Sequence, residues 1–329
     1  MKANYLKRVT LIAAFLIASN IFVLAQTGVK SKSAALAIDE KNVRAEMNFL
    51  AGDAMMGRQS GTIFEWIAAE YISSQFMQFG LEPAGDKDGS GRLTYLQAVV
   101  TPNRTWNAIG KITGTDKNLA SEVILLSAHL DHLGMRDTAS GDDKIFNGAD
   151  DDASGSIAVL ELARVLGSGQ KPKRTVYFVC FGSEEVGGFG ARYFIDNLPF
   201  PKEKLVANLE FEMIGRPDAK VKAEELWLTG YERSNLGPEL AKRGARLVAD
   251  PHPEQNFFRR SDNYTLARQG IIAHTVSSYG LHTDYHKVTD EIKTIDFVHM
   301  TQAINSMVAP VQWLINSDFK PSWIEGKKP

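Results

Sequence analysis

The sequence has little of what several classes of protein depend on. Cys180 is its only cysteine in 329 residues, so an internal disulfide is excluded and stability must come from the core or from bound metal. Lys and Arg number 37 against 39 Asp and Glu, which leaves no positive field to attract nucleic acid. We find no internal repeat, no phosphate-binding loop and, beyond the N-terminal region, no apolar run long enough to cross a membrane. We therefore expect no nucleic-acid partner.

The N-terminus has the pattern of a signal peptide. A basic start precedes an apolar run of 17 residues at positions 9–25, and the small residues at its end favour cleavage near Gln26. A retained anchor helix is the alternative, but this length is at the lower limit for crossing a bilayer. We expect residues 1–25 to be a signal peptide, 26–38 a linker, and the mature protein to be secreted or periplasmic without stable membrane insertion.

From residue 39 onward, helical and strand-like patterns alternate. Segments 123–127 and 175–181 are short, continuous apolar runs, as expected of strands buried on both faces. Further strands are predicted at 93–100, 205–213, 226–229 and 271–276, and helices at 40–52, 64–79, 154–166 and 190–197. This alternation predicts one α/β domain over 39–329, a three-layer α/β/α sandwich around a mixed, mostly parallel sheet.

Polar side chains that can bind metal follow the predicted strands, where ligands of such sheets gather. His129 and Asp131 come just after segment 123–127 and, two residues apart, project to the same side. A carboxylate beside a metal-binding histidine can hold its second ring nitrogen. A histidine that is only hydrogen-bonded at a strand end is the alternative.

Two acidic groups come next. Asp150, Asp151 and Asp152 open a predicted helix, and adjacent carboxylates repel one another unless a cation neutralises them. A solvated loop with an aspartate N-cap is the alternative. Glu184 and Glu185 follow the strand at 175–181, where one could bind metal while the other moves protons. An exposed acidic turn is the alternative there.

Two more segments complete the set of candidate ligands. Glu210 and Glu212 share one face of segment 205–213, and His282 and His286 lie in a polar loop at 280–290. Together the segments supply His, Asp, Glu, Glu and His after successive strands, with an acid to spare. Five such ligands with one bridging carboxylate suit a pair of zinc ions about 3.5–4 Å apart, and the lack of thiolates favours an open catalytic site.

These segments form a set of short motifs in a fixed order along the chain. The motifs are Gly57-Arg58…Gly61, His129-Leu130-Asp131, Ala149-Asp150-Asp151-Asp152-Ala153-Ser154-Gly155, Glu184-Glu185-Val186-Gly187, Glu212-Met213, Ser261-Asp262, and His286 four residues before Asp290. The set resembles the zinc-dependent exopeptidase family M28, which includes secreted bacterial aminopeptidases. The resemblance covers essentially the whole chain after the signal peptide.

The resemblance implies a role for each candidate ligand. Asp151 would bridge two zinc ions, with Glu185 and His286 completing one site and His129 and Glu212 the other. Another divalent metal could replace zinc.

The resemblance also implies a mechanism. Asp131 would orient His129, and Glu184 would be the general base that takes a proton from the attacking water and passes it to the leaving amine. The expected activity is that of an aminopeptidase acting on peptides, without a covalent intermediate.

The chain departs from the family pattern at three places. Many members have aspartate where Glu212 stands and histidine where Asn263 stands, and no protease-associated domain is inserted between Val100 and Ser121. These departures leave a carboxypeptidase or another amide hydrolase as alternatives. A glutaminyl cyclase with one zinc and a non-catalytic binding module are further alternatives. The sequence assigns no role to His132, His282 and Asp284, nor an oligomeric state.

Overall fold

The computed structural model describes residues 37–100, 104–137 and 141–329. The predicted signal peptide and nearly all of the predicted linker lie outside these residues. Ile38–Pro329 forms one compact unit. Within the described ranges, no helix combines the length and the apolar character that crossing a membrane requires.

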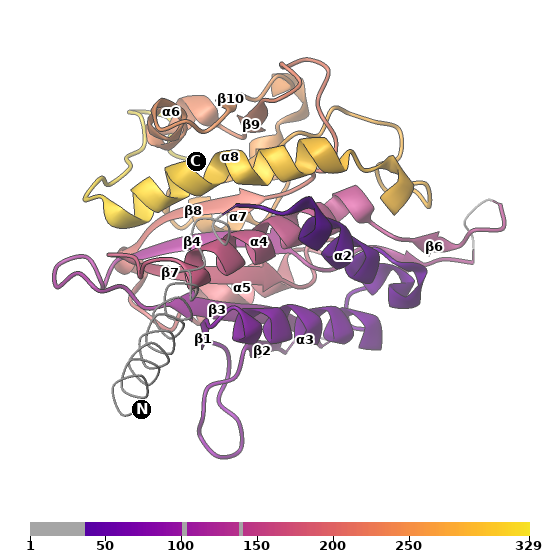
Figure 1. Cartoon of the computed structure of the whole chain (residues 1–329), viewed down its shortest axis with the longest axis horizontal. Coiled ribbons are helices and arrows are strands. Elements are labelled where there is room, and N and C mark those ends of the chain that lie inside the picture. The colour runs from indigo at the N-terminus through magenta and orange to yellow at the C-terminus, as the bar shows by residue number, and fades with distance from the viewer. Residues whose placement is uncertain (1–36, 101–103, 138–140) are drawn as a thin grey trace, which may run out of the picture. The chain divides into compact units, whose positions relative to one another are not determined.

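A nine-stranded sheet lies at the centre of this unit (Figure 1), with strand order β1-β3-β7-β4-β8-β11-β9-β10 and β2 paired to β3. The strands are β1 (Glu82–Pro83), β2 (Leu96–Val99), β3 (Thr105–Ile112), β4 (Val123–His129), β7 (Thr175–Phe181), β8 (Leu205–Phe211), β9 (Leu226–Leu228), β10 (Leu247–Ala249) and β11 (Ala273–Ser277). A separate ribbon pairs β5 (Gly134–Met135) with β6 (Ile145–Phe146).

The middle of the sheet is parallel. β7, β4, β8 and β11 run in one direction, so their carboxyl ends meet at the same edge of the sheet. β3 joins β7 and β9 joins β11 in antiparallel pairs. The sheet is therefore mixed, with the parallel strands in the centre.

Helices cover both faces of the sheet. Residues of α2 (Glu40–Leu50), α3 (Ile63–Gln78), α4 (Gly155–Ser168), α6 (Leu236–Lys242) and α8 (Phe297–Asn316) pack in one core, and those of α5 (Phe189–Asp196) and α7 (Asn263–Ala267) pack in a second (Figure 1). Along β4, Ile124 and Leu126 belong to the first core and Leu125 to the second. Both faces of the strand are therefore buried, which explains its continuous apolar run. The predicted three-layer α/β/α architecture is confirmed.

Two large elements, β3 and α8, were not predicted from the sequence. β3 contains Asn107, whose side chain is fully buried. This side chain donates hydrogen bonds to Gln97 and to the carbonyl of Gly190, which satisfy its amide group. α8 contains Pro310 in its interior. The predicted elements differ from the observed ones mainly at their ends, as for β2, which is shorter than segment 93–100.

Candidate metal centre

The structure brings all seven predicted site residues to the carboxyl edge of the parallel strands. His129 is the last residue of β4, and Glu212 directly follows β8. Asp151 lies in an irregular helical turn, Ala149–Ser154, that precedes α4. The others lie in loops: Asp131 after β4, Glu184 and Glu185 after β7, and His286 between β11 and α8.

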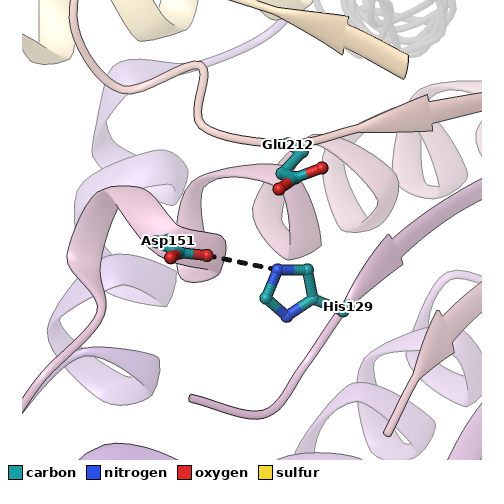
Figure 2. A group of neighbouring side chains, drawn as sticks. All are labelled: His129, Asp151 and Glu212. Carbon is teal, nitrogen blue, oxygen red and sulfur yellow. Dashed lines mark ion pairs between the residues drawn. The ribbon is translucent and has the colours of Figure 1, made fainter. Parts of the chain in front are cut away.

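A first group of metal-binding side chains contains His129, Asp151 and Glu212 (Figure 2). One donor atom from each lies within 4.8 Å of the other two. The Nε2 of His129 is 3.2 Å from the Oδ1 of Asp151. His129 and Asp151 are buried, whereas Glu212 is half-buried, so the group is open on one side.

A second group lies around the other oxygen of Asp151. The Nε2 of His286 is 3.1 Å from the Oδ2 of Asp151 and 3.2 Å from the Oε2 of Glu185. The Nδ1 of His132 is 2.8 Å from the Oε1 of Glu185, and His132 also groups with Asp151 and Glu185 as a candidate ligand set. Two histidines therefore reach the same pair of carboxylates.

The donor atoms fit metal ions of the size of zinc. Ligands 2.0–2.1 Å from a tetrahedral ion are about 3.3 Å apart, close to the 3.1–3.2 Å that separate the ring nitrogens of His129 and His286 from Asp151. In the described part of the chain, the buried Nε2 of His129 and Oε1 of Glu185 make no hydrogen bond of good geometry, and their close polar contacts are with other candidate ligands. Such atoms are costly unless a ligand satisfies them.

The side chain of Asp131 holds the turn that carries the two glutamates. Its Oδ1 accepts a hydrogen bond from the backbone N–H of Glu184 at 2.9 Å, and its Oδ2 accepts one from Glu185 at 3.3 Å. The Nδ1 of His129 lies 3.2 Å from the main-chain carbonyl of Asp131 and 3.7 Å from its carboxylate. Asp131 therefore contacts three of the site residues at once.

Asp152 joins three segments of the site. Its carboxylate accepts hydrogen bonds from the backbone N–H groups of His129 at 3.2 Å, Gly155 at 2.9 Å and Met213 at 3.1 Å. The contact with Gly155 lies at the start of α4, where an aspartate cap was one of the alternatives considered for this segment. The peptide bond between Asp151 and Asp152 is cis.

Arg58 belongs to one of the sequence motifs, but no role was predicted for it. Its side chain is fully buried and connects two segments of the site. Its guanidinium donates to the carbonyls of Leu130 at 2.9 Å, Asn147 at 2.7 Å and Gly148 at 3.0 Å. Burial lowers the pKa of Arg58, and the nearby carboxylate of Asp131 opposes that change. The side chain therefore ties the segment after β4 to the turn that carries Asp151.

A second missed group secures the loop of His286. The buried carboxylate of Asp290 accepts from the backbone N–H groups of Asp150 at 3.0 Å and Asp151 at 3.1 Å. Arg216 donates to Asp284 at 2.8 Å, and its guanidinium lies 3.6 Å from Asp290.

His282 belongs to the same group, because its Nε2 lies 2.9 Å from the Oδ2 of Asp150. The two loop residues without a role in the sequence analysis, His282 and Asp284, thus connect the loop to the turn that carries Asp151. The side chains that hold this loop could not be identified from their spacing, because they come from distant segments.

The site concentrates negative charge in a buried region. Burial raises the pKa of Glu184 well above its usual value, and neighbouring carboxylates raise it further. Burial also raises the pKa of Glu212, to about 7. Burial lowers the pKa of His286, but Asp151 and Glu185 outweigh this effect and raise it to about 9. A bound cation would compensate this concentration of negative charge.

Three non-glycine residues at the site have left-handed backbone conformations. Ser183 (φ 62°) precedes Glu184, Met213 (φ 51°) follows Glu212, and His286 itself has φ 55°. Such conformations are uncommon for residues with side chains and concentrate at functional sites. The backbone is therefore strained next to Glu184, next to Glu212 and at His286 itself.

The sequence matches a protein-family model and several curated proteins. A model of Peptidase family M28 matches residues 107–311. The leupeptin-inactivating enzyme 1 of Streptomyces exfoliatus is 35% identical over 137 residues, which cover 41% of this chain and 28% of that protein. Aminopeptidase YwaD of Bacillus subtilis is 25% identical over 211 residues, which cover 62% of this chain and 44% of that protein. The chain spans less than half the length of these curated relatives.

A solved structure shares the fold. A zinc aminopeptidase from Bacillus subtilis superposes with a TM-score of 0.65 at 17% identity, covering 86% of this chain and 96% of that one. The family model matches more than half of this chain and includes every candidate ligand from His129 to His286. The chain therefore belongs to Peptidase family M28.

Proposed function

We propose that this chain is a zinc metallopeptidase that removes N-terminal residues from peptides. The observation that carries the proposal is a pair of donor groups that share Asp151, with His129 and Glu212 on one side and Glu185 and His286 on the other. Both groups consist of nitrogen and oxygen donors, as a catalytic zinc pair requires. The names of the relatives, two of which are aminopeptidases, support the same reaction.

When bound, a zinc pair lowers the pKa of a water molecule and polarises the scissile carbonyl. The chain supplies the proton transfer. Glu184 accepts the proton of the attacking water on its carboxylate and delivers it to the leaving amine. Its half-buried position and its pKa, which burial raises above the usual value, suit a group that gives a proton as well as taking one.

The remaining side chains position these groups. Asp131 holds the backbone of Glu184 through a 2.9 Å hydrogen bond, which keeps the base beside the ligands. The half-buried carboxylate of Glu212 faces a pocket and is available to pair with the free amine of a substrate. The signal-peptide pattern at residues 1–25 supports a secreted or periplasmic location.

The first experiment measures metal content and hydrolysis together. Purified protein is analysed for zinc, and a leucine chromogenic substrate is assayed for wild type and for Glu184→Gln, with the exposed Glu203→Gln as the matched control. We expect two zinc ions per chain in all three proteins and a loss of about 10²–10⁴-fold in kcat for Glu184→Gln alone. Full activity in Glu184→Gln, or turnover that a chelator leaves unchanged, contradicts the proposal.

Two further substrates separate the other reactions of this site. An N-acetylated peptide tests for a carboxypeptidase or endopeptidase, because an aminopeptidase refuses a blocked amine. A peptide with N-terminal glutamine tests for a cyclase, which releases ammonia and leaves the peptide bond intact. One zinc per chain together with ammonia release would replace the aminopeptidase proposal with the cyclase.

A further inference from the structure

A small pocket opens beside the candidate metal centre. Its lining includes Glu212, the aromatic residues Trp227, Phe257, Tyr279 and Tyr285, and Arg260. Its volume is about 30 Å³, where a single water molecule needs about 10–15 Å³. The pocket therefore has room for the few atoms of a short side chain.

The wall of the pocket is a continuous aromatic surface that reaches the candidate ligands. Trp227 stacks on Phe257 with ring centres 5.3 Å apart, and Phe257 contacts Tyr279 at 5.8 Å. Tyr285 stacks on His286 with ring centres 3.9 Å apart. A side chain bound in the pocket would therefore lie beside the candidate ligands Glu212 and His286.

Arg260 is a cation without a counter-ion at this pocket. Its guanidinium lies over the rings of Phe257 at 4.8 Å and Tyr285 at 5.9 Å. The side chain is exposed, and among the residues that the structure describes it forms no ion pair with a carboxylate. The two rings hold the charge at the pocket while leaving its N–H groups available.

The pocket also contains a second unused donor. The indole Nε1 of Trp227 is buried and has no hydrogen-bond partner in the described ranges. The side chains of the pocket thus offer a guanidinium and an indole N–H beside the hydroxyls of two tyrosines, two threonines and a serine. The one carboxylate, Glu212, belongs to the candidate metal centre. Two donors and a positive charge in a small space are complementary to a carboxylate.

We infer that the pocket receives the side chain of the substrate's N-terminal residue and that Arg260 selects aspartate or glutamate there. The inference rests on the proposed aminopeptidase function and names its substrate class. A second source of a carboxylate is the C-terminus of a short substrate, and the experiment separates the two.

The test compares four aminoacyl p-nitroanilides, with Glu, Gln, Leu and Lys as the amino acid. Glu and Gln have the same size and differ in charge, so their ratio of kcat/KM reports on Arg260 alone. We expect wild type to prefer Glu over Gln by at least about tenfold and Arg260→Gln to bring the ratio near one. Arg260→Glu should favour Lys over Glu.

Arg259→Gln is the matched control. Arg259 is exposed like Arg260, but its guanidinium lies over Tyr264 at 5.7 Å and it does not line the pocket. We expect this variant to keep the wild-type ratio. A wild type that cleaves Leu and Gln as well as Glu, with the same ratios in Arg260→Gln, overturns the inference while leaving the aminopeptidase proposal intact.

A binding measurement keeps the inference testable if no aminoacyl substrate is cleaved. Free glutamate and free glutamine are titrated into the zinc-loaded protein and followed by tryptophan fluorescence, because Trp227 lines the pocket. If glutamate binds more tightly than glutamine and Arg260→Gln loses this difference, the result supports recognition of an acidic side chain by the pocket, even if the protein catalyses a different reaction. Equal binding of both amino acids overturns it.

N-acetylated dipeptides with a free C-terminus test the second source of a carboxylate. Cleavage that depends on Arg260 would assign this residue to the substrate's α-carboxylate and would overturn the side-chain inference.

Discussion

At the residue scale, the least expected feature of the site is that two histidines face the same carboxylates. His286 contacts Asp151 and Glu185, and it is partly exposed. His132 is buried, and its Nδ1 contacts Glu185. Among the described residues, its Nε2 has no hydrogen-bond partner. The resemblance to M28 peptidases assigns the ligand role to His286 and leaves His132 without one.

Metal content of two alanine variants separates these roles. We expect His286→Ala to retain about one zinc per chain, because it removes a proposed ligand. His132→Ala should retain two, with zinc affinity lowered about 10–100-fold, as is usual for a residue that contacts a ligand. Elemental analysis after dialysis against graded chelator measures both. The reverse pattern would make His132 the ligand.

His274 in β11 provides a pH dependence away from the metal centre. Its Nδ1 lies 2.7 Å from the carbonyl of Thr229 and its Nε2 lies 2.7 Å from the hydroxyl of Ser234. Burial lowers its pKa to about 4. In the unfolded chain His274 binds a proton below about pH 6.5, whereas in the folded chain it does so only below about pH 4. Stability is therefore lost as the pH falls through this window.

Urea unfolding of metal-free protein at pH 7 and pH 4.5 measures this effect. We expect wild type to lose up to about 3 kcal/mol from His274 between these pH values, in addition to losses from other groups. Between the same two pH values, His274→Gln should lose less free energy of unfolding than wild type, by about the contribution of His274. An identical loss in both proteins would show that His274 does not titrate differently on folding.

At the scale of elements, the predictable part of the fold is the part that apolar runs and caps describe. β4 and β7 are buried on both faces and are continuous in apolar residues, so their sequence pattern was sufficient. β3 contains Asn107 and Lys111, and its burial depends on partners far along the chain. The strand therefore lacks a local signal. α8 was not predicted although it has a local signal, the Asp296 side chain that accepts from the N–H of His299.

The candidate site, like the fold, contains a part that could be predicted from the sequence and a part that could not. The candidate ligands could be chosen from the sequence because each belongs to a recognisable motif, and the structure brings them to one edge of the sheet. The contacts of Arg58, Asp290 and Arg216 could not, because each joins segments that are distant in sequence. Their positions follow only from the assembled sheet.

Arg58 tests how strongly the elements of the site depend on such a contact. Arg58→Met keeps most of the side-chain volume but leaves the carbonyls of Leu130, Asn147 and Gly148 without their buried donor. We expect a loss of at least about 3 kcal/mol in the free energy of unfolding. Arg44→Met, which removes an exposed ion pair with Glu40, should lose less than about 1 kcal/mol. Similar losses in the two variants would contradict this role of Arg58.

At the scale of the whole molecule, bound metal is expected to be a major source of stability. Cys180 is buried and unpaired, so no disulfide constrains the unfolded chain. Ions that bind the folded protein but not the unfolded one stabilise it by about 4 kcal/mol when their free concentration is 1,000 times the dissociation constant.

Thermal unfolding with and without chelator measures this contribution. We expect chelator to lower Tm by about 10 °C and added zinc to restore it. Glu184→Gln should show the full shift because it retains the proposed ligands, whereas Asp151→Asn should show much less. A Tm that chelator leaves unchanged in wild type would contradict the metal pair.

The donors of the site are contributed by segments that extend from residue 129 to residue 286, and they meet only at one edge of the finished sheet. A chain that is still being synthesised lacks the His286 segment until most of its length has been made. We therefore expect a partial chain to be unable to complete the proposed metal pair, so that hydrolysis requires the finished and folded protein.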